Sequence, residues 1–369
     1  MNIIINTSTC VSGGGVQVCS NLIIESLNDD NNSYFYFLSK EVNEYLVKQN
    51  IIIKYNVIIF KKSPASIFFR RKFKKIVEKV ILNFNPILIF TVFGPAYFNF
   101  KIKHLVGFAD PWVTHSNVYA FKVLNIYETA YRRLLTIYKL YYLRNEKFIW
   151  VETIMAKNGL MNKLDIQDDN IFVIPNSCNP LYYNRKLNIK FDKINTKIFI
   201  LTAYYKHKNL EILFPLIEIL IKNNFLNFQF ILTLPENSSF IKKIKRNRTI
   251  NKYIINLGPL SVQDCINNYE DCSIVFLPTL LENISAVYLE SILLNKIFIT
   301  TNFDFAKDIC KDSCLYFEPM NPNDAYCKLI DVFENEKLRN ELYKKQNKIQ
   351  IINPTIKFDY YLNIFKKIL

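Results

Sequence analysis

Residues 273–302 read SIVFLPTLLENISAVYLESILLNKIFITTN, and this stretch decides the fold. Ser273–Thr279 is a short apolar run rich in β-branched and aromatic residues, which is typical of a buried strand. Lys296–Thr301 has the same character. Between them, Ile284–Leu294 is nearly all apolar and long enough for a helix. A strand, a helix and a strand at this spacing predict a βαβ unit and therefore a parallel sheet.

Two glutamates stand out in this unit. Glu282 follows the first predicted strand, whereas Glu290 lies inside the apolar helix. Burying an ionised carboxylate is costly unless a partner compensates, so we expect hydrogen-bond donors around Glu290. Ligands of open parallel sheets bind at the carboxyl ends of the strands, which is where Glu282 is. The helix start near Ser285 offers backbone N–H groups that can hold an anion.

The rest of the chain repeats this alternation of strands and helices. We expect further strands at residues 2–9, 34–38, 51–60, 87–92, 104–109, 148–153, 197–203, 228–234, 253–257 and 314–318. The alternation in two halves predicts an α/β fold with two doubly wound, Rossmann-like domains.

Composition limits the class of protein. The 369 residues suffice for two domains with full cores. A net charge of +15 favours an anionic partner, which can be nucleic acid, anionic lipid or a phosphorylated small molecule, but a basic soluble surface explains it equally well. The eight cysteines lack zinc-binding spacing, so we expect reduced thiols and no metal site. With no long apolar run and no leader segment, a cytoplasmic protein is expected.

A glycine cluster follows the first predicted strand. Gly13, Gly14 and Gly15 separate that strand from an amphipathic helix over residues 16–27. A glycine loop in this position either cradles an anion or is a plain tight turn. It matches neither the dinucleotide fingerprint nor the Walker A motif.

The helix predicted over residues 61–82 is strongly basic. It mixes Lys and Arg with Phe68, Phe69 and Phe73. Such a helix can lie on an anionic membrane surface or pack its apolar side on the sheet, and the two are compatible. Residues 120–148 are also predicted to be helical, basic and rich in Tyr.

A basic loop follows the strand predicted over residues 197–203. It contains Lys206, His207 and Lys208 and lies just before a helix. Cations at a strand's carboxyl end suit a diphosphate, although a solvated basic loop would look the same.

Taken together, these features resemble the nucleotide-sugar-dependent glycosyltransferases of family 4, which have the GT-B fold. The resemblance rests on the Glu282-x7-Glu290 pattern after Pro278, on Pro175-Asn176 between the halves, and on the run Gly258–Ser261 after a strand. It implies two doubly wound domains that face each other across a cleft. The expected domains are an acceptor-binding domain over 1–177, joined by the final helix over 354–369, and a donor-binding domain over 178–353. Residues 176–193 are interpreted as the linker.

The resemblance also implies roles for the matching residues. Glu290 would accept the ribose hydroxyls of the donor, and Lys208 would offset its diphosphate charge. Glu282 would hold sugar hydroxyls near the reacting carbon and is a catalytic candidate. Backbone amides of Asn283, Ile284 and Ser285 would hold phosphate or sugar oxygens. The three glycines at 13–15 would face the cleft.

The chain departs from the family at two strand ends. Ala109 stands where many members have the His of a His-Asp pair. Asp110 remains as a second catalytic candidate, and either Asp110 or His115 would face the sugar. Alternatively, Asp110 caps the turn before Pro111.

The second departure concerns the donor phosphates. Ala203 stands in place of a phosphate-binding Arg, so Lys206 or His207 would supply that contact. Asn283-Ile284-Ser285 also replaces a Gly-Phe-Gly-like run, which implies a different fit to the sugar.

The resemblance implies that the chain moves a sugar from a nucleotide-sugar donor to a glycan or lipid-linked glycan acceptor. Retention of anomeric configuration, no metal or other cofactor, and a role in bacterial surface polysaccharide synthesis (lipopolysaccharide or capsule) are expected with it. An anionic membrane surface is a further expected partner, on the inner face of the cytoplasmic membrane. Three alternatives remain: a GT-B epimerase or phosphorylase, an inactive scaffold, and a nucleic-acid-binding protein, for which no binding motif is recognisable.

Overall fold

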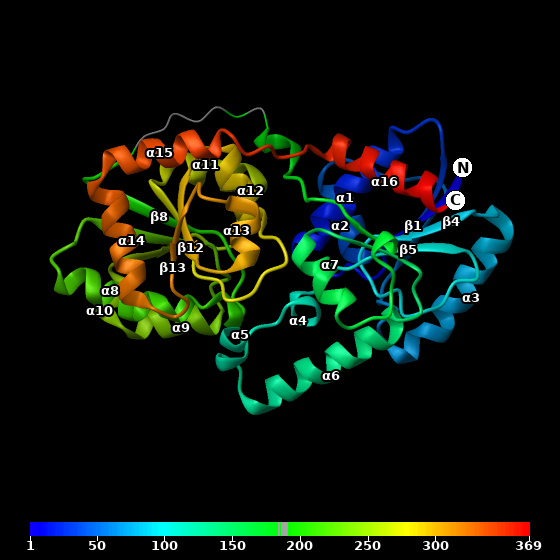
Figure 1. Cartoon of the computed structure of the whole chain (residues 1–369), viewed down its shortest axis with the longest axis horizontal. Coiled ribbons are helices and arrows are strands. Elements are labelled where there is room, and N and C mark those ends of the chain that lie inside the picture. The colour runs from blue at the N-terminus through cyan, green and yellow to red at the C-terminus, as the bar shows by residue number, and fades with distance from the viewer. Residues whose placement is uncertain (184, 186–190) are drawn as a thin grey trace. The chain divides into compact units, whose positions relative to one another are not determined.

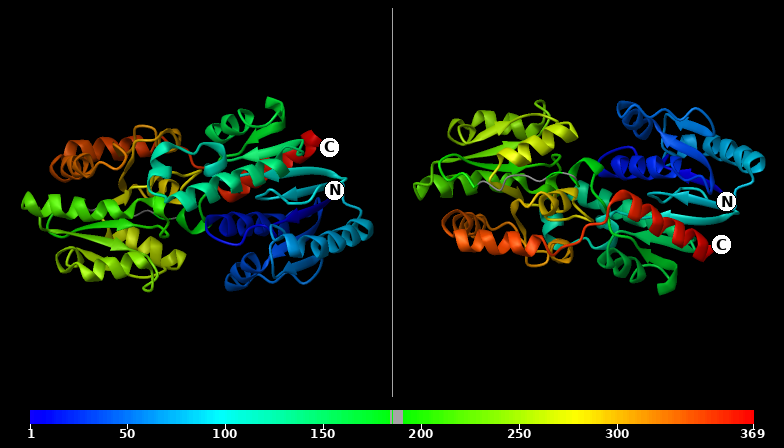
Figure 2. Two further views of the ribbon diagram at one scale, coloured as in Figure 1. Left: turned by 90° about the horizontal axis from the view of Figure 1, so that it is seen from below. Right: turned by 90° about the horizontal axis from the view of Figure 1, so that it is seen from above.

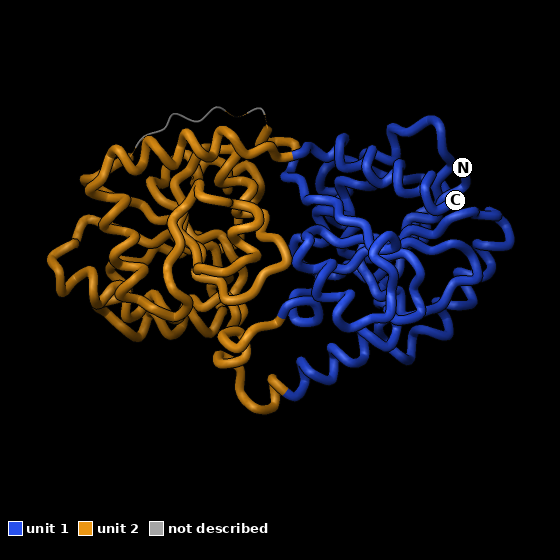
Figure 3. Tube along the Cα trace, in the orientation of Figure 1, with its two compact units in different colours: residues 1–115, 130–179, 352–369 blue, residues 116–129, 180–351 orange. Residues whose placement is uncertain are grey.

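The computed structural model describes residues 1–183, 185 and 191–369, so part of the linker predicted over 176–193 lies outside the described residues. The chain forms two compact units, which Figure 3 distinguishes by colour. Unit 1 contains residues 1–115, 130–179 and 352–369, and unit 2 contains residues 116–129 and 180–351. In each unit, helices cover both faces of one sheet (Figures 1 and 2).

Unit 1 is built from alternating strands and helices. Its strands are β1 Asn2–Asn6, β2 Ser33–Ser39, β3 Val57–Phe60, β4 Leu88–Thr91, β5 Lys103–Gly107, β6 Phe148–Val151 and β7 Ile171–Val173. Its helices are α1 Gly14–Leu27, α2 Lys40–Lys48, α3 Ile67–Phe84, α4 Pro111–Thr114, most of α6 Ile126–Leu143, α7 Ile154–Met161 and α16 Pro354–Ile368.

Unit 2 repeats the pattern. Its strands are β8 Thr196–Ile200, β9 Phe228–Leu232, β10 Ile254–Asn256, β11 Ile274–Leu277, β12 Ile297–Thr301 and β13 Leu315–Phe317. Its helices are α5 Val118–Lys122, α8 Leu213–Lys222, α9 Ser239–Arg246, α10 Arg248–Asn251, α11 Val262–Asp271, α12 Ala286–Leu293, α13 Asp304–Cys310, α14 Pro322–Glu334 and α15 Glu336–Gln346. Short 3-10 turns include Pro180–Tyr182 and Lys206–Lys208.

The two sheets share one topology. The strand order is β3-β2-β1-β4-β5-β6-β7 in unit 1 and β10-β9-β8-β11-β12-β13 in unit 2, and the described pairs are parallel. The predicted βαβ unit is confirmed as β11, α12 and β12, with Ile274 opposite Ile297. Each sheet therefore has the doubly wound order, which reverses between β1 and β4 and between β8 and β11.

The core of unit 1 follows the period-2 alternation of its strands. Ile3 and Ile5 pack in the cluster that includes α1 and α16, whereas Ile4 packs in the cluster that includes α3. α3 contributes Phe73, Val77 and Val80 to that second cluster. Its predicted packing on the sheet is thus confirmed.

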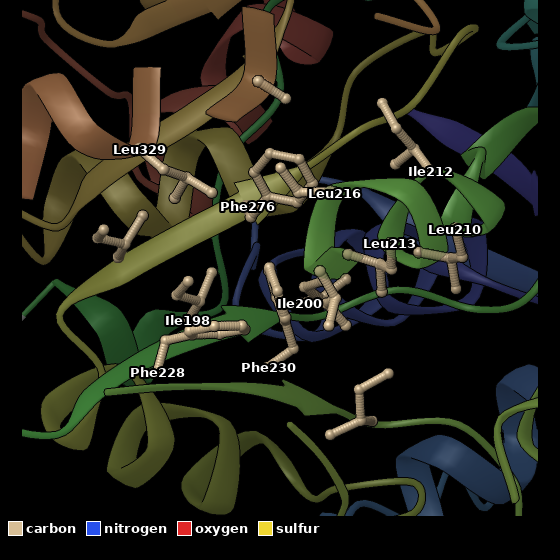
Figure 4. Packing of buried hydrophobic residues seen from close by; sticks show 14 of the residues in the cluster. Ile198, Ile200, Leu210, Ile212, Leu213, Leu216, Phe228, Phe230, Phe276 and Leu329 are labelled. Carbon is tan, nitrogen blue, oxygen red and sulfur yellow. The ribbon is translucent and has the colours of Figure 1, made fainter. Parts of the chain in front are cut away.

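One core cluster of unit 2 lies on the α8 side of its sheet. Figure 4 shows Ile198, Ile200, Phe228, Phe230 and Phe276 from the strands against Leu213 and Leu216 of α8 and Leu329 of α14. Such continuous apolar strands are expected where both sheet faces are covered.

Two predictions were wrong in detail, and one helix was missed. The strand expected over 51–60 is formed only at Val57–Phe60, because Ile51 and Ile53 pack against the core from a loop. The helical stretch over 120–148 is divided into α5 and α6. Helix α2, which Ser39 caps by accepting from the Val42 N–H at 3.1 Å, was not predicted.

Residues 116–129 belong with unit 2, although the sequence placed them in the first domain. The Asn117 side-chain amide donates to the Leu280 carbonyl at 2.7 Å, and the Glu128 carboxylate pairs with Lys206 at 2.7 Å. These polar contacts join the segment to loops of unit 2. Among the helices that the structure describes, none combines the length and apolar composition needed to cross a bilayer.

Candidate active site

The candidate site lies where the strand order of unit 2 reverses. β8 and β11 are neighbours there, and each leads into a loop at its carboxyl end. The loop over residues 201–209 carries the predicted cations, and the loop over residues 278–285 carries Glu282. Ligands of doubly wound sheets bind outside the carboxyl ends of the strands at such a reversal.

Backbone hydrogen bonds hold the two loops together. The His207 carbonyl accepts from the Leu280 N–H at 2.7 Å and from the Thr279 hydroxyl at 3.4 Å. The Thr301 hydroxyl, at the end of β12, donates to the Thr279 carbonyl. The cationic turn is therefore fixed against the glutamate loop before any ligand binds.

Lys208 and Glu282 meet across these loops. The Lys208 ammonium donates to Glu282 Oε1, and the side chains are only 14% and 12% exposed. An ion pair so shielded from water keeps most of its electrostatic attraction. The structure thus brings one predicted cation and one predicted carboxylate together at this strand end, although they are 74 residues apart in the sequence.

The two neighbours of Lys208 are differently placed. Lys206 pairs with Glu128 at 2.7 Å and is partly exposed. The His207 ring stacks on Tyr205, with ring centroids 5.6 Å apart and planes 12° from parallel. Their proposed substitution for the missing Arg stays a prediction.

Glu290 belongs to α12 and is buried against α11. Its Oε2 accepts from the Tyr269 hydroxyl at 2.8 Å, and the Tyr182 hydroxyl also hydrogen-bonds the carboxyl group. Burial raises the pKa of Glu290 to about 7, and the two tyrosine hydrogen bonds oppose that rise. The donors that a carboxylate in an apolar helix requires are therefore present. Acceptance of ribose hydroxyls by Glu290 stays a prediction.

The start of α12 is the predicted anion site. Ser285 is the N-cap residue, and its side chain makes no capping hydrogen bond, so it does not compete for the first N–H groups of the helix. Asn283 and Ser285 are buried, and Ile284 is half-buried. The helix begins at Ala286 rather than at Ile284, so all three residues lie in the loop.

In unit 1 the glycine cluster lies at the corresponding reversal, after β1. Gly13 is the N-cap of α1 with φ 67° and ψ −159°, so Gly14 and Gly15 open the helix rather than extend the loop. A Cβ at Gly13 or Gly14 would meet nothing within 4 Å. The loop therefore presents bare backbone on the surface of unit 1.

Gly13→Ala is expected to destabilise unit 1 by about 1–3 kcal/mol, because only glycine adopts this backbone conformation at low cost. Urea unfolding measures the change. Gly14→Ala is the matched control, since Gly14 has a helical backbone and open space; it should be neutral or slightly stabilising. Equal stability of the two variants would contradict the assignment of strain to Gly13.

Asp110 lies at the end of β5 in unit 1. One carboxylate oxygen accepts from the Trp112 N–H at 3.0 Å, and the other pairs with Lys139 of α6. The capping interpretation of Asp110 is therefore confirmed. The neighbouring His115 ring hydrogen-bonds the Thr114 hydroxyl at 2.7 Å. A role for either residue toward a sugar stays a prediction.

Residues 185–349, which include both candidate loops and α12, match the family model described as "Glycosyl transferases group 1". This segment of unit 2 is therefore similar to group 1 glycosyltransferases. No curated protein matches the chain significantly by sequence.

Solved structures are similar in fold to this chain over its whole length. A glycosyltransferase from Rickettsia africae has a TM-score of 0.73 and 17% identity, covering 100% of this chain and 98% of that one. HepE of Anabaena, in complex with UDP and glucose, has a TM-score of 0.72 and 12% identity, and the comparison covers 100% of both chains. The UDP-GlcNAc 2-epimerase of Neisseria meningitidis has a TM-score of 0.64 and 14% identity, and the comparison again covers 100% of both chains. The predicted GT-B fold is confirmed.

Sequence reasoning missed the partners of Glu290. Tyr269 lies in the last turn of α11, and Tyr182 lies in the 3-10 turn after the division between the halves. Both are almost fully buried, and their rings lie edge to face with centroids 6.2 Å apart. The sequence indicated only that a buried Glu290 needs hydrogen-bond donors. It did not indicate which residues of the chain supply those donors.

Proposed function

We propose that this protein transfers a sugar from a nucleotide-sugar donor to a glycan or lipid-linked glycan acceptor. The observation that carries the proposal is the shielded Lys208–Glu282 pair at the reversal of the unit 2 sheet, within the segment that matches the glycosyltransferase family model. Retention of anomeric configuration and a role in bacterial surface polysaccharide synthesis are parts of this proposal. Unit 1 would bind the acceptor.

The chemistry follows from the charges at the site. The bond between the anomeric carbon and a diphosphate oxygen breaks, and the same carbon bonds an acceptor hydroxyl oxygen, whose proton passes to the departing diphosphate. Lys208 and the N–H groups at the start of α12 would stabilise the charge on the departing diphosphate. Glu282 would hold sugar hydroxyls beside the reacting carbon. Among the described residues, no group of three or more His, Cys, Asp or Glu side chains could hold a metal ion. We propose metal independence because Lys208 can offset the charge of the diphosphate.

A nucleoside diphosphate is expected to raise the melting temperature of the chain. A ligand at 100 times its dissociation constant stabilises by about 2.7 kcal/mol. UDP, GDP, CMP and ADP are compared by thermal shift, with UDP first because HepE is solved with UDP. Glu290→Ala should reduce the shift if Glu290 contacts the ribose. Failure of all four nucleotides would count against a donor site in unit 2.

Product analysis separates the alternative functions. Transfer to an acceptor, with the anomeric configuration read by NMR and with EDTA present throughout, supports a retaining, metal-independent transferase. Epimerised sugar without transfer would favour the epimerase alternative. An absence of both, with salt-dependent binding of oligonucleotide, would favour a nucleic-acid-binding protein.

A further inference from the structure

Helix α6 exposes an apolar stripe that the sequence did not single out. All of its residues are described, and Leu143 alone is buried. Tyr131, Leu134, Ile137 and Tyr141 are spaced three or four residues apart, which places them on one face, and Leu134 is 67% exposed. Soluble proteins scatter exposed apolar residues singly, so a continuous stripe along a helix indicates an interaction surface.

Arg70 fixes the start of α3 against the end of α6. Its guanidinium donates to the hydroxyls of Tyr138 and Tyr142, and it lies 5.0 Å from the Tyr142 ring centroid. These contacts place Ile67 and the 98% exposed Phe68 at the same corner of unit 1, which Figure 1 shows where the two helices meet. The α6 stripe and the neighbouring start of α3 are together called the α3–α6 corner.

Cations surround the α3–α6 corner. Residues 130–144 contain Arg132, Arg133 and Arg144, besides Lys139, which pairs with Asp110, and no Asp or Glu. Residues 67–77 contain Arg and Lys but no acid. The Arg144 guanidinium lies 4.3 Å from the Tyr141 ring centroid, at the edge of the stripe. An apolar stripe flanked by cations matches a surface that is apolar inside and anionic outside. A second copy of this corner would bring like charges together, which disfavours self-association.

We propose that the α3–α6 corner docks on the surface of an anionic lipid bilayer. Leu134, Ile137 and Phe68 would enter the boundary between headgroups and acyl chains, and the flanking Arg and Lys would contact lipid phosphates. The inference deepens the proposed function, on which it rests, by naming the surface that brings the chain to a lipid-linked acceptor.

The test is co-sedimentation of the full chain with vesicles. Vesicles of equal parts phosphatidylglycerol and phosphatidylcholine should bind the chain, pure phosphatidylcholine should bind it at least about tenfold more weakly, and high salt should weaken binding. Leu134→Gln with Ile137→Gln should weaken binding to the anionic vesicles at least about tenfold, because the apolar contribution is lost while the charge is unchanged. Ile154→Gln with Ile356→Gln is the matched control, since both isoleucines are exposed elsewhere in unit 1; it should bind like the wild type.

Several outcomes would overturn the docking proposal. These are equal binding to neutral vesicles, no binding at all, or equal loss in the control variant. Self-association in light scattering that the Leu134 and Ile137 variant abolishes would assign the corner to a second copy instead. Nucleotide thermal shifts are measured on the same samples. If nucleotides still raise the melting temperature but the chain does not bind vesicles, only the docking proposal is refuted. If the chain binds vesicles but no nucleotide raises the melting temperature, only the donor site is refuted.

Discussion

Lys208→Met should lower kcat for sugar transfer by about 10²–10³-fold, which is the typical effect of removing one transition-state donor. Lys208 is the shielded cation of the candidate site and contacts the Glu282 carboxylate. Methionine keeps the length of the side chain but cannot offset the charge on a departing diphosphate. Steady-state kinetics with the donor identified by thermal shift measures the effect, which should fall on kcat more than on KM.

Lys206→Met is the matched control for Lys208→Met. Lys206 lies in the same 3-10 turn but pairs with Glu128 in a half-exposed position, so its loss should cost less than about tenfold. A larger loss of kcat in Lys206→Met than in Lys208→Met would indicate that Lys206, and not Lys208, contacts the diphosphate. Lys208→Met should also lower the free energy of unfolding by about 3–5 kcal/mol, since a buried ion pair loses one partner. Adding Glu282→Gln should recover stability without recovering activity.

The second large effect concerns pH. Glu290 has a pKa of about 7 in the folded chain against a reference value of 4.5. Between these values the unfolded chain releases the proton while the folded chain retains it, so stability falls as pH rises through this window. The difference amounts to about 3 kcal/mol at 1.36 kcal/mol per pKa unit. The contribution is fully present below pH 4.5 and lost above pH 7.

Glu290→Gln removes this titration. The difference in unfolding free energy between Glu290→Gln and the wild type should therefore shift by about 3 kcal/mol in favour of the variant between pH 4.5 and pH 8. Urea titrations at several pH values measure it, and other titrating groups cancel in the difference. Tyr269→Phe, which removes one hydrogen bond to the carboxylate, should move the transition to higher pH. A difference that does not vary with pH would contradict burial of an ionisable Glu290.

The sequence predicted those parts of the fold that depend on local pattern. The run Ile274–Leu277, the apolar helix after it and β12 could be identified because apolar strands and helices of sufficient length differ in residue type and spacing. Helix α2 was missed because Lys40–Lys48 is mostly polar and is stabilised by a cap and two packed side chains. Residues 116–129 were misplaced because their assignment depends on Asn117 and Glu128, whose partners are distant in the sequence.

The candidate site was predicted in its parts but not in its connections. The positions of Lys208 and Glu282 at strand ends followed from strand assignment, whereas their direct contact depends on which strands are neighbours. The tyrosines beside Glu290 could not be predicted, because neither Tyr182 nor Tyr269 is distinguishable by type or spacing from the other tyrosines of a chain that has 23.

The return of α16 to unit 1 has a consequence for biosynthesis. Phe358, Tyr361 and Phe365 of this helix belong to the same core cluster as Ile3 and Ile5 of β1. The ribosome therefore makes all of unit 2 before it makes the helix that closes one side of the first sheet. During that interval unit 1 has an incomplete apolar core, which is the kind of surface that chaperones recognise and that aggregates. Unit 2, whose core cluster around α8 lies within residues 191–343, can finish folding first.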